Sequence, residues 1–354
     1  MNSAQAEKYA HYTMRAGNSG EGTLSISEPD RHIEHPIMAT FNLTPSNPST
    51  FSLSGILGLE TAHVWISIPV SMSYIISLLG NVMLLFIIGK EPTLHKPMYL
   101  LLSMLAFTDI ATSTLVVPKA LCIFWFSFKS ITVGWCLTQM FFLHTVSFTQ
   151  SAILVTMAFD RYVAICHPLR YSTILTNARV SKLGLVGLIR SALFILPLPL
   201  ILSRLPFCAN LIIHQTHCEH MAVAKISCGD ITVSRMYSLV MAFVVSGIDL
   251  MLIALSYGLI IRDILKMSSK KSLQKTLNTC TAHICVMLTT YSPGLFTSLT
   301  HRFGQGVDPH VHIILANLTF LIPPMLNPII YGVKTKELRD KVGKYTSRIC
   351  SLGH

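Results

Sequence analysis

The stretch VWISIPVSMSYIISLLGNVMLLFIIG, residues 64–89, contains no charged side chain. The hydrocarbon core of a bilayer needs about 20 predominantly apolar residues in a helix, so this stretch is long enough to cross one. Six further stretches of the chain have the same character. The sequence therefore predicts an all-α membrane protein, a seven-transmembrane helix bundle with spans at roughly 64–89, 98–126, 136–165, 180–203, 236–261, 277–300 and 310–332.

The composition of the 354 residues agrees with a membrane protein, because 51% are hydrophobic and only 12% are charged. Soluble proteins carry about 25% charged residues. This excludes a disordered chain, a collagen-like chain and most soluble enzymes. The formal net charge of +11 would by itself suggest a nucleic-acid partner, so its location in the sequence matters.

The basic residues gather on one predicted side of the membrane. The loops after the first, third and fifth spans, together with the tail, hold 17 Lys and Arg against five Asp and Glu, whereas the rest of the chain is nearly balanced. By the positive-inside rule these segments are cytoplasmic, which places the N-terminus outside and the C-terminus inside. The basic surplus is therefore interpreted as topology and contact with anionic membrane lipids, with no nucleic-acid partner.

The membrane-spanning region divides the chain into three parts. Residues 1–63 are polar and are predicted to be a largely disordered extracellular segment without a cleavable signal peptide. Met38 begins a shorter leader, and Asn42-Leu43-Thr44 is a glycosylation sequon on the outer side. A seven-transmembrane domain is placed at 64–332, followed by a cytoplasmic tail, 333–354, with a short amphipathic helix.

Four of the nine cysteines fall on the predicted outer face: Cys136, Cys208, Cys218 and Cys228. An oxidising environment favours disulfides, and four cysteines allow three pairings between which spacing cannot choose. The nearby His217-Cys218-Glu219-His220 run fits no common zinc arrangement, so no metal and no cofactor are expected. Phosphate-cradling, nucleophile-elbow and HExxH motifs are absent from the sequence, and the protein is not expected to be an enzyme.

Ionisable side chains inside predicted spans are costly and are therefore functional candidates. They are Asp109, Asp160, Arg161, Arg190 and Asp249, with His144 and His283 beside them. The adjacent Asp160 and Arg161 close the third span at its cytoplasmic edge, where we expect them to form an ion pair that a partner protein can break. The alternative interpretation of Arg161 is a side chain that only reaches the lipid interface.

Several ordered motifs together resemble one family. They are PMYLLLS at 97–103 with Asp109, MAFDRYVAICHPLRY at 157–171, Ser256-Tyr257, KTLNTCTAH at 275–283 and PMLNPIIYG at 324–332. The sequence from about Gly55 to Arg339 resembles the olfactory receptors, which are rhodopsin-like G-protein-coupled receptors of the plasma membrane. Further stretches resemble the class I (fish-like) branch: GIDL at 247–250, HCEHM at 217–221 and THRFG at 300–304.

The resemblance implies a pairing of the outer cysteines, Cys136–Cys218 and Cys208–Cys228. It also implies that a heterotrimeric G protein binds at Asp160 and Arg161 and that Tyr257, Asn327 and Tyr331 rearrange on activation. Activation of a stimulatory G protein and cAMP signalling would follow.

The resemblance further implies a small odorant ligand held between the helices. Tyr291 matches an aromatic position at the floor of the ligand site, and Arg302 matches a position that pairs with a ligand carboxylate. Arg suits this role because its planar fork can hold a carboxylate through two bonds. Ser298 lies one helical turn before Arg302, and His144, roughly 12 Å along its helix from Cys136, matches another ligand position.

Three residues depart from the family pattern: Gln150 replaces a usual Glu near Asp109, Thr290 replaces a Phe, and Phe159 replaces a Tyr. The first change weakens any sodium-type site between the second and third spans. Two alternatives to an odorant receptor share these sequence features. One is a receptor of the same fold with a non-olfactory ligand, and the other is a small transporter or channel, which the lack of similarity between residues 64–165 and 236–332 disfavours.

Overall fold

The structure is a computed structural model, and all of its described residues belong to one compact unit, Asn42–His354. It describes residues 48–352 except 57, 208–210, 266–269 and 304–307. Within that range the side chains at 270–273, 275–279, 297–303, 309, 346 and 348–352 are not described.

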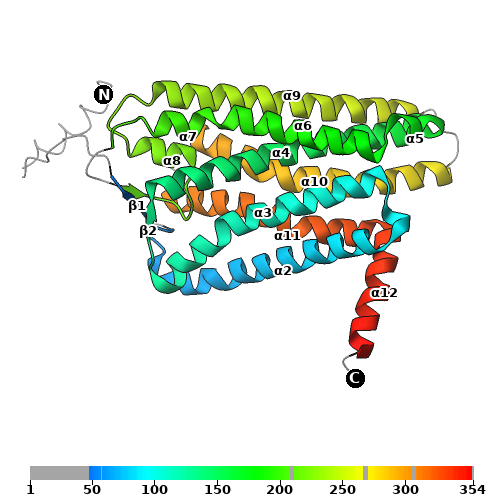
Figure 1. Cartoon of the computed structure of the whole chain (residues 1–354), viewed down its shortest axis with the longest axis horizontal. Coiled ribbons are helices and arrows are strands. Elements are labelled where there is room, and N and C mark those ends of the chain that lie inside the picture. The colour runs from blue at the N-terminus through cyan, green and yellow to red at the C-terminus, as the bar shows by residue number, and fades with distance from the viewer. Residues whose placement is uncertain (1–47, 57, 208–210, 266–269, 304–307, 353–354) are drawn as a thin grey trace, which may run out of the picture. The chain divides into compact units, whose positions relative to one another are not determined.

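Long helices form a bundle in which they run side by side (Figure 1). The helix α2 packs against α3 and α11, α4 packs against α3, α6 and α9, and α10 packs against α11. These helices correspond one for one to the seven predicted spans: α2 His63–Lys90, α3 Pro97–Phe126, α4 Val133–Cys166, α6 Asn177–Ile195 continued by α7 Pro197–Leu202, α9 Thr232–Ile264, α10 Lys270–Phe303 and α11 Pro309–Lys334.

Six of the long helices, counted over the described residues alone, are apolar enough to cross a membrane. The remaining one, α10, begins with the polar run KKSLQK at 270–275 before its apolar part. Local sequence fixes several helix starts. The Thr132 and Thr176 side chains accept hydrogen bonds from the backbone N–H groups of Trp135 and Arg179 and so cap α4 and α6.

The fourth span is divided into two helices at a proline. Helix α6 ends at Ile195 and α7 begins at Pro197, which has no N–H to continue the helical hydrogen bonds. By contrast, Pro118, Pro293 and Pro328 lie inside continuous helices. Neighbouring helices in a membrane bundle can stabilise such positions.

A small sheet lies at the outer end of the bundle. Strand β1, Thr50–Leu53, pairs antiparallel with β2, Ser130–Thr132, and parallel with β3, Ile212–Ile213, so the N-terminal segment supplies the central strand. The sequence did not predict a strand in this segment. After β1 the chain turns at Gly55, whose φ of +78° and whose close approach to His63 both require glycine.

The buried apolar residues form two main clusters, one in each half of the bundle, and a small third one around Ile260 and Ile264 of α9. The outer cluster contains Phe51 and Leu53 of β1 together with Cys136, Met140 and Cys218. The larger cytoplasmic cluster contains Leu101, Leu154 and Tyr331 together with Leu338 of the tail helix α12, Lys336–Leu352. The outer sheet and the tail helix are thus each packed onto a core, one at either end of the bundle.

The tail helix α12 is also tied to the first cytoplasmic loop. The Glu91 carboxylate accepts hydrogen bonds from Lys341 and from the Tyr345 hydroxyl. The Tyr345 ring lies edge-on to Phe86 of α2, with 5.6 Å between the ring centroids. The Lys341 ammonium, as the main cause, holds the pKa of Glu91 below its usual value. These contacts fix the start of the cytoplasmic tail against the bundle.

Candidate functional site

The second outer loop enters the helix bundle as a roof segment, which we define as residues 214–220. Cys218 is joined to Cys136 of α4 by a disulfide, the pairing that the family resemblance implies. Gln139, one turn along α4, makes the same connection without a covalent bond, because its side chain accepts from the Cys218 N–H at 3.0 Å and donates to the Leu115 carbonyl of α3 at 2.6 Å. Cys228 is also disulfide-bonded, whereas Cys208 lies outside the described residues.

The roof segment is attached to two further helices and to the turn that follows β1. Thr216 donates to Asn317 of α11 at 2.6 Å, and the His220 ring pairs with the Ser234 hydroxyl of α9 at 2.9 Å. The Gly55 N–H donates to the Gln215 carbonyl at 3.3 Å. These contacts fix the roof segment across the outer half of the bundle.

The predicted ligand residues can be placed only in part. His144 lies on α4, where its Nδ1 is 2.9 Å from the Met140 carbonyl, and it lies near Glu219 of the roof segment. Tyr291 lies lower, on α10. Ser298 and Arg302 lie in the last turns of α10, but their side chains are outside the described residues, and so is the sequon residue Asn42.

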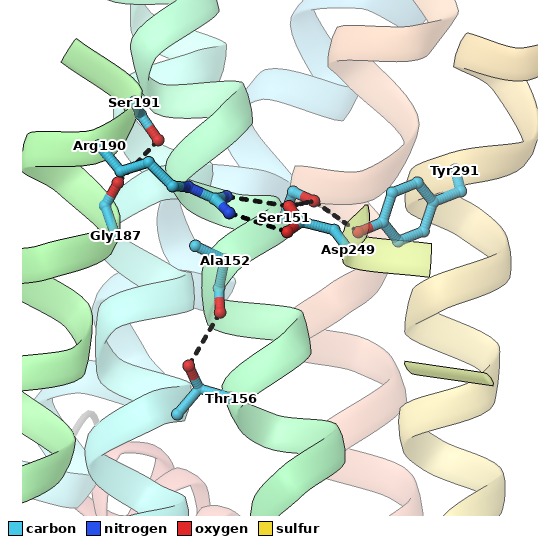
Figure 2. A network of polar contacts seen from close by, with 8 residues as sticks. All are labelled: Ser151, Ala152, Thr156, Gly187, Arg190, Ser191, Asp249 and Tyr291. Atoms are coloured by element: carbon cyan, nitrogen blue, oxygen red, sulfur yellow. Dashed lines mark hydrogen bonds and ion pairs between the residues drawn. The ribbon is translucent and has the colours of Figure 1, made fainter. Parts of the chain in front are cut away.

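A polar cluster occupies the middle of the bundle (Figure 2). The Arg190 guanidinium of α6 donates two bonds of 2.9 Å to the two carboxylate oxygens of Asp249 on α9. Ser151 of α4 donates to the same carboxylate at 2.6 Å and also contacts the Tyr291 hydroxyl of α10 at 2.7 Å. We call these four residues the central network, and they connect four different helices.

A second buried carboxylate, Asp109 of α3, is surrounded by side-chain amides. Gln150 of α4 donates to it at 2.7 Å, and the Asn327 amide of α11 donates at 3.0 and 3.2 Å to its two oxygens. Asp109 and Asn327 are 0% and 1% exposed. Two neutral amides on two other helices therefore donate hydrogen bonds to this carboxylate.

At the cytoplasmic end, Arg161 is held by its neighbour in sequence. Its guanidinium donates to one Asp160 oxygen at 2.5 and 3.1 Å, and the Tyr171 hydroxyl donates to the other oxygen at 2.7 Å. Burial, followed by the charge of Asp160, raises the pKa of Tyr171, so this hydroxyl keeps its proton. We call Asp160, Arg161 and Tyr171 the cytoplasmic lock. The ion pair expected from the sequence is present.

Two more of the predicted activation residues, Tyr257 and Tyr331, lie at the same end of the bundle as this lock. The Tyr257 hydroxyl of α9 hydrogen-bonds with the His283 ring of α10 at 2.7 Å. Tyr331 of α11 is buried, and it lines a cavity of about 10 Å³ together with Arg161 and His283. The structure thus brings Asp160, Arg161, Tyr257 and Tyr331 to one end of the bundle, while Asn327 lies with Asp109.

Comparison with known proteins agrees with this arrangement. A family model described as olfactory receptor matches residues 70–348. The chain belongs to the olfactory receptor family. Human olfactory receptor 52P1 is 48% identical over 305 residues, which cover 86% of this chain and 95% of the relative. Human olfactory receptor 52N4 is 47% identical over 306 residues, with the same coverage of both chains.

The fold is shared with a solved receptor of much lower sequence similarity. The crystal structure of squid rhodopsin superposes with a TM-score of 0.63 at 17% identity, covering 82% of this chain and 87% of that one. The protein is therefore an odorant-sensing G-protein-coupled receptor of the plasma membrane with a seven-helix bundle, and it is not an enzyme.

Sequence reasoning for this olfactory receptor singled out Arg190 and Asp249 as costly intramembrane charges but did not pair them. The signal that could have paired them is that they are opposite charges, each inside a predicted membrane span, where a lone charge is costly. It also missed Ser151, Gln139 and Asn317, because a single polar residue on an apolar helix does not reveal which neighbouring helix it faces. Their roles come from geometry alone.

Proposed function

We propose that the receptor binds a small polar odorant, in particular one with a carboxylate, between its helices and below the roof segment. Ligand binding activates a stimulatory heterotrimeric G protein and raises cAMP. The observation that supports this proposal is the central network, because it connects four helices between the outer ligand positions and the cytoplasmic lock.

Tyr291 connects ligand binding to the rest of the bundle in this proposal. Its hydroxyl shares Ser151 with the Asp249 carboxylate, so a ligand that moves the ring on α10 changes the partners of a charged pair on α6 and α9. Only a ligand that binds the rearranged state more tightly than the resting state shifts the population between them. Displacement of α10 then separates Tyr257 from His283 and opens the cytoplasmic end to the G protein.

Arg302 and Ser298 supply the carboxylate preference in the proposal. An arginine at the outer end of α10 can hold a carboxylate through two parallel bonds, and Ser298 on the same helical face can donate a further one. His144 is the third ligand residue. Anionic lipids are expected to contact the basic cytoplasmic loops and the exposed face of α12.

A cAMP assay in transfected cells tests the proposal, with a panel of straight-chain acids, alcohols, ethers and esters. We expect Arg302→Ala to abolish responses to acids and Arg161→Ala to abolish every response. Antibody staining of live cells must show that each variant reaches the surface. Unchanged acid responses in Arg302→Ala contradict the carboxylate role, and normal signalling by Arg161→Ala contradicts the coupling role.

A further inference from the structure

The protonation of His217, in the middle of the roof segment, can be deduced from its neighbours. The Asn317 amide nitrogen donates to the Ile313 carbonyl at 2.7 Å, which orients the amide so that its oxygen faces Thr216. An amide oxygen can only accept. The contact of 2.6 Å between that oxygen and the Thr216 hydroxyl therefore uses the single hydrogen of Thr216.

The Thr216 hydroxyl then has only lone pairs to offer to its other neighbour. It lies 3.3 Å from Nδ1 of His217, so the hydrogen of that contact must be carried by Nδ1. Burial lowers the pKa of His217 to about 4, and the ring is neutral at pH 7. A neutral imidazole with a hydrogen on Nδ1 has a bare lone pair on Nε2.

That Nε2 atom is buried and finds no hydrogen-bond partner in the part of the chain that the structure describes. The His217 side chain is 0% exposed. An unpaired polar atom in such a place has a free-energy cost, and a group that donates to it gains a bond that water does not replace. Of the two buried roof histidines, His220 is not fixed in this way, because its Ser234 partner can donate or accept.

His217 also lies at the depth expected for a ligand. Its ring stands edge-on to Phe320 of α11, with 5.3 Å between the centroids. Phe320 is eleven residues from the outer end of α11, roughly 16 Å along the helix, and His144 is equally far from the start of α4. Burial is the main cause of the lowered pKa of His217, and His144 lies near enough to contribute to it. The roof segment therefore brings His217 into the outer half of the bundle beside a predicted ligand residue.

We propose that His217 is a specificity-determining residue whose Nε2 accepts a hydrogen bond from a hydroxyl group of the odorant. The inference rests on the proposed function, in that a small odorant occupies the space between the helices, and it specifies a further group that this odorant carries. Alcohols and hydroxy-acids can make this bond. Ethers, esters and ionised acids without a hydroxyl have no hydrogen to donate to Nε2.

The tautomer can be measured without any ligand. Nitrogen-15 NMR of the full-length receptor, labelled at histidine and held in lipid nanodiscs, distinguishes a protonated from a bare ring nitrogen. The His217 signals are those lost in His217→Gln, or in His217→Asn if the first variant does not fold. We expect a hydrogen on Nδ1 and none on Nε2 at pH 7. The opposite tautomer, or a charged ring, overturns the inference.

The specificity is tested with 1-hexanol to 1-decanol against the methyl ether of each alcohol in the cAMP assay. We expect the alcohols to be at least about tenfold more potent than their ethers, a difference that His217→Phe removes. His217→Gln, which can present an oxygen near the Nε2 position, should keep part of the preference. His214→Gln is the matched control, because His214 is an exposed histidine of the same loop that bonds with Ser54.

Thr216 provides a variant that changes the tautomer without changing His217. Thr216→Val removes the acceptor for Nδ1–H, which allows the hydrogen to move to Nε2 and donate. We expect its alcohol preference to fall and its response to ethers to rise, whereas Thr216→Ser keeps the wild-type order. A purely structural role for Thr216 would lower both responses equally and would count against the inference.

Failure of this inference can be separated from failure of the proposed function. A surface-expressed receptor that responds to acids or esters, with no alcohol preference and no effect of His217→Phe, overturns the hydroxyl assignment alone. A surface-expressed receptor that responds to nothing in the panel contradicts the proposed function, and the NMR measurement still decides the tautomer of His217.

Discussion

Arg190 and Asp249 face each other across two helices, and the guanidinium of one donates to both carboxylate oxygens of the other at 2.9 Å. Asp249 is 1% exposed, so its charge has little access to solvent. Such a pair is costly to form in an apolar environment, but it is more costly to leave half-formed, because the remaining charge is then buried alone.

We therefore expect Asp249→Leu and Arg190→Met each to destabilise the folded receptor, by about 3–5 kcal/mol, and to reduce surface delivery. The double variant should recover much of the folding free energy while losing ligand-dependent signalling, because the central network is then gone. Thermal unfolding of purified receptor and the cAMP assay measure the two effects. Simple addition of the two single losses would show that the residues do not act as a pair.

Gln150 places a neutral hydrogen-bond donor, and no second carboxylate, beside Asp109. Its amide donates to Asp109 in the wild type, and Asn327 donates from the opposite helix. We expect the melting temperature of the wild-type receptor to be the same in sodium chloride and in choline chloride of equal concentration. Gln150→Glu replaces a donor by a second carboxylate, and should make the melting temperature rise with sodium.

One outcome of the sodium experiment would contradict this prediction. Wild-type stabilisation by sodium that disappears in Asp109→Asn would show that the amides do not exclude a cation. Thr138→Glu is a matched control, because it introduces the same charge at an exposed position of α4 away from Asp109.

The sequence predicted the seven helices because each span carries its own signal, about 20 consecutive apolar residues. Every predicted span overlaps a helix of the structure, and the ends differ by a few residues. The helices could be predicted because a chain inside a bilayer must satisfy its backbone hydrogen bonds within each helix. Outside the bilayer that constraint is lost, and the strands β1, β2 and β3 of the outer sheet were not predicted.

Contacts between distant residues were harder to predict than helices. Asp160 and Arg161 are adjacent in the chain, so their pairing followed from the sequence alone. Arg190 and Asp249 are 59 residues apart, and their pairing depends on which faces of α6 and α9 meet. The tautomer of His217 depends on Thr216, Asn317 and Ile313 together, and no local pattern contains that information.

Burial of His217 in the roof segment makes the stability of the folded receptor depend on pH. Burial lowers the pKa of His217 to about 4 from its ordinary value of 6.5, so between these values the unfolded chain binds a proton that the folded receptor does not. Stability therefore rises with pH across this window and is lost as the pH falls from about 6.5 to about 4. The contribution of His217 is at most about 3 kcal/mol.

Melting temperatures between pH 4 and pH 7.5 check this sign. We expect a falling melting temperature toward pH 4 in the wild type and a shallower fall in His217→Gln. Variants at His214, which is exposed, should follow the wild-type curve. Equal slopes in wild type and His217→Gln would show that this residue is not held neutral by folding.

Leu169 is an apolar side chain that the fold leaves in solvent. It lies on the second cytoplasmic loop, next to the lock, and it is 97% exposed. A single exposed apolar side chain is ordinary on a protein surface, and what makes Leu169 a candidate contact is its place on the loop that leads to Tyr171. We expect Leu169→Ser to lower odorant-stimulated cAMP by severalfold at unchanged surface level, while Leu169→Met keeps it. An unchanged response in Leu169→Ser would exclude this side chain from the G-protein contact.

Tyr171 holds the cytoplasmic lock from the loop side, since its hydroxyl donates to the Asp160 oxygen that Arg161 does not use. A hydrogen bond to a charged group contributes about 1.5–3 kcal/mol, so its loss weakens the hold of Asp160 on Arg161 without removing either charge. We expect Tyr171→Phe to raise basal cAMP severalfold, and Asp160→Asn to raise it further. Tyr237→Phe is the matched control, because that hydroxyl donates to the Phe194 carbonyl on other helices. Basal signalling that stays at the wild-type level in Tyr171→Phe, with normal surface staining, would mean that Asp160 holds Arg161 without help from the loop.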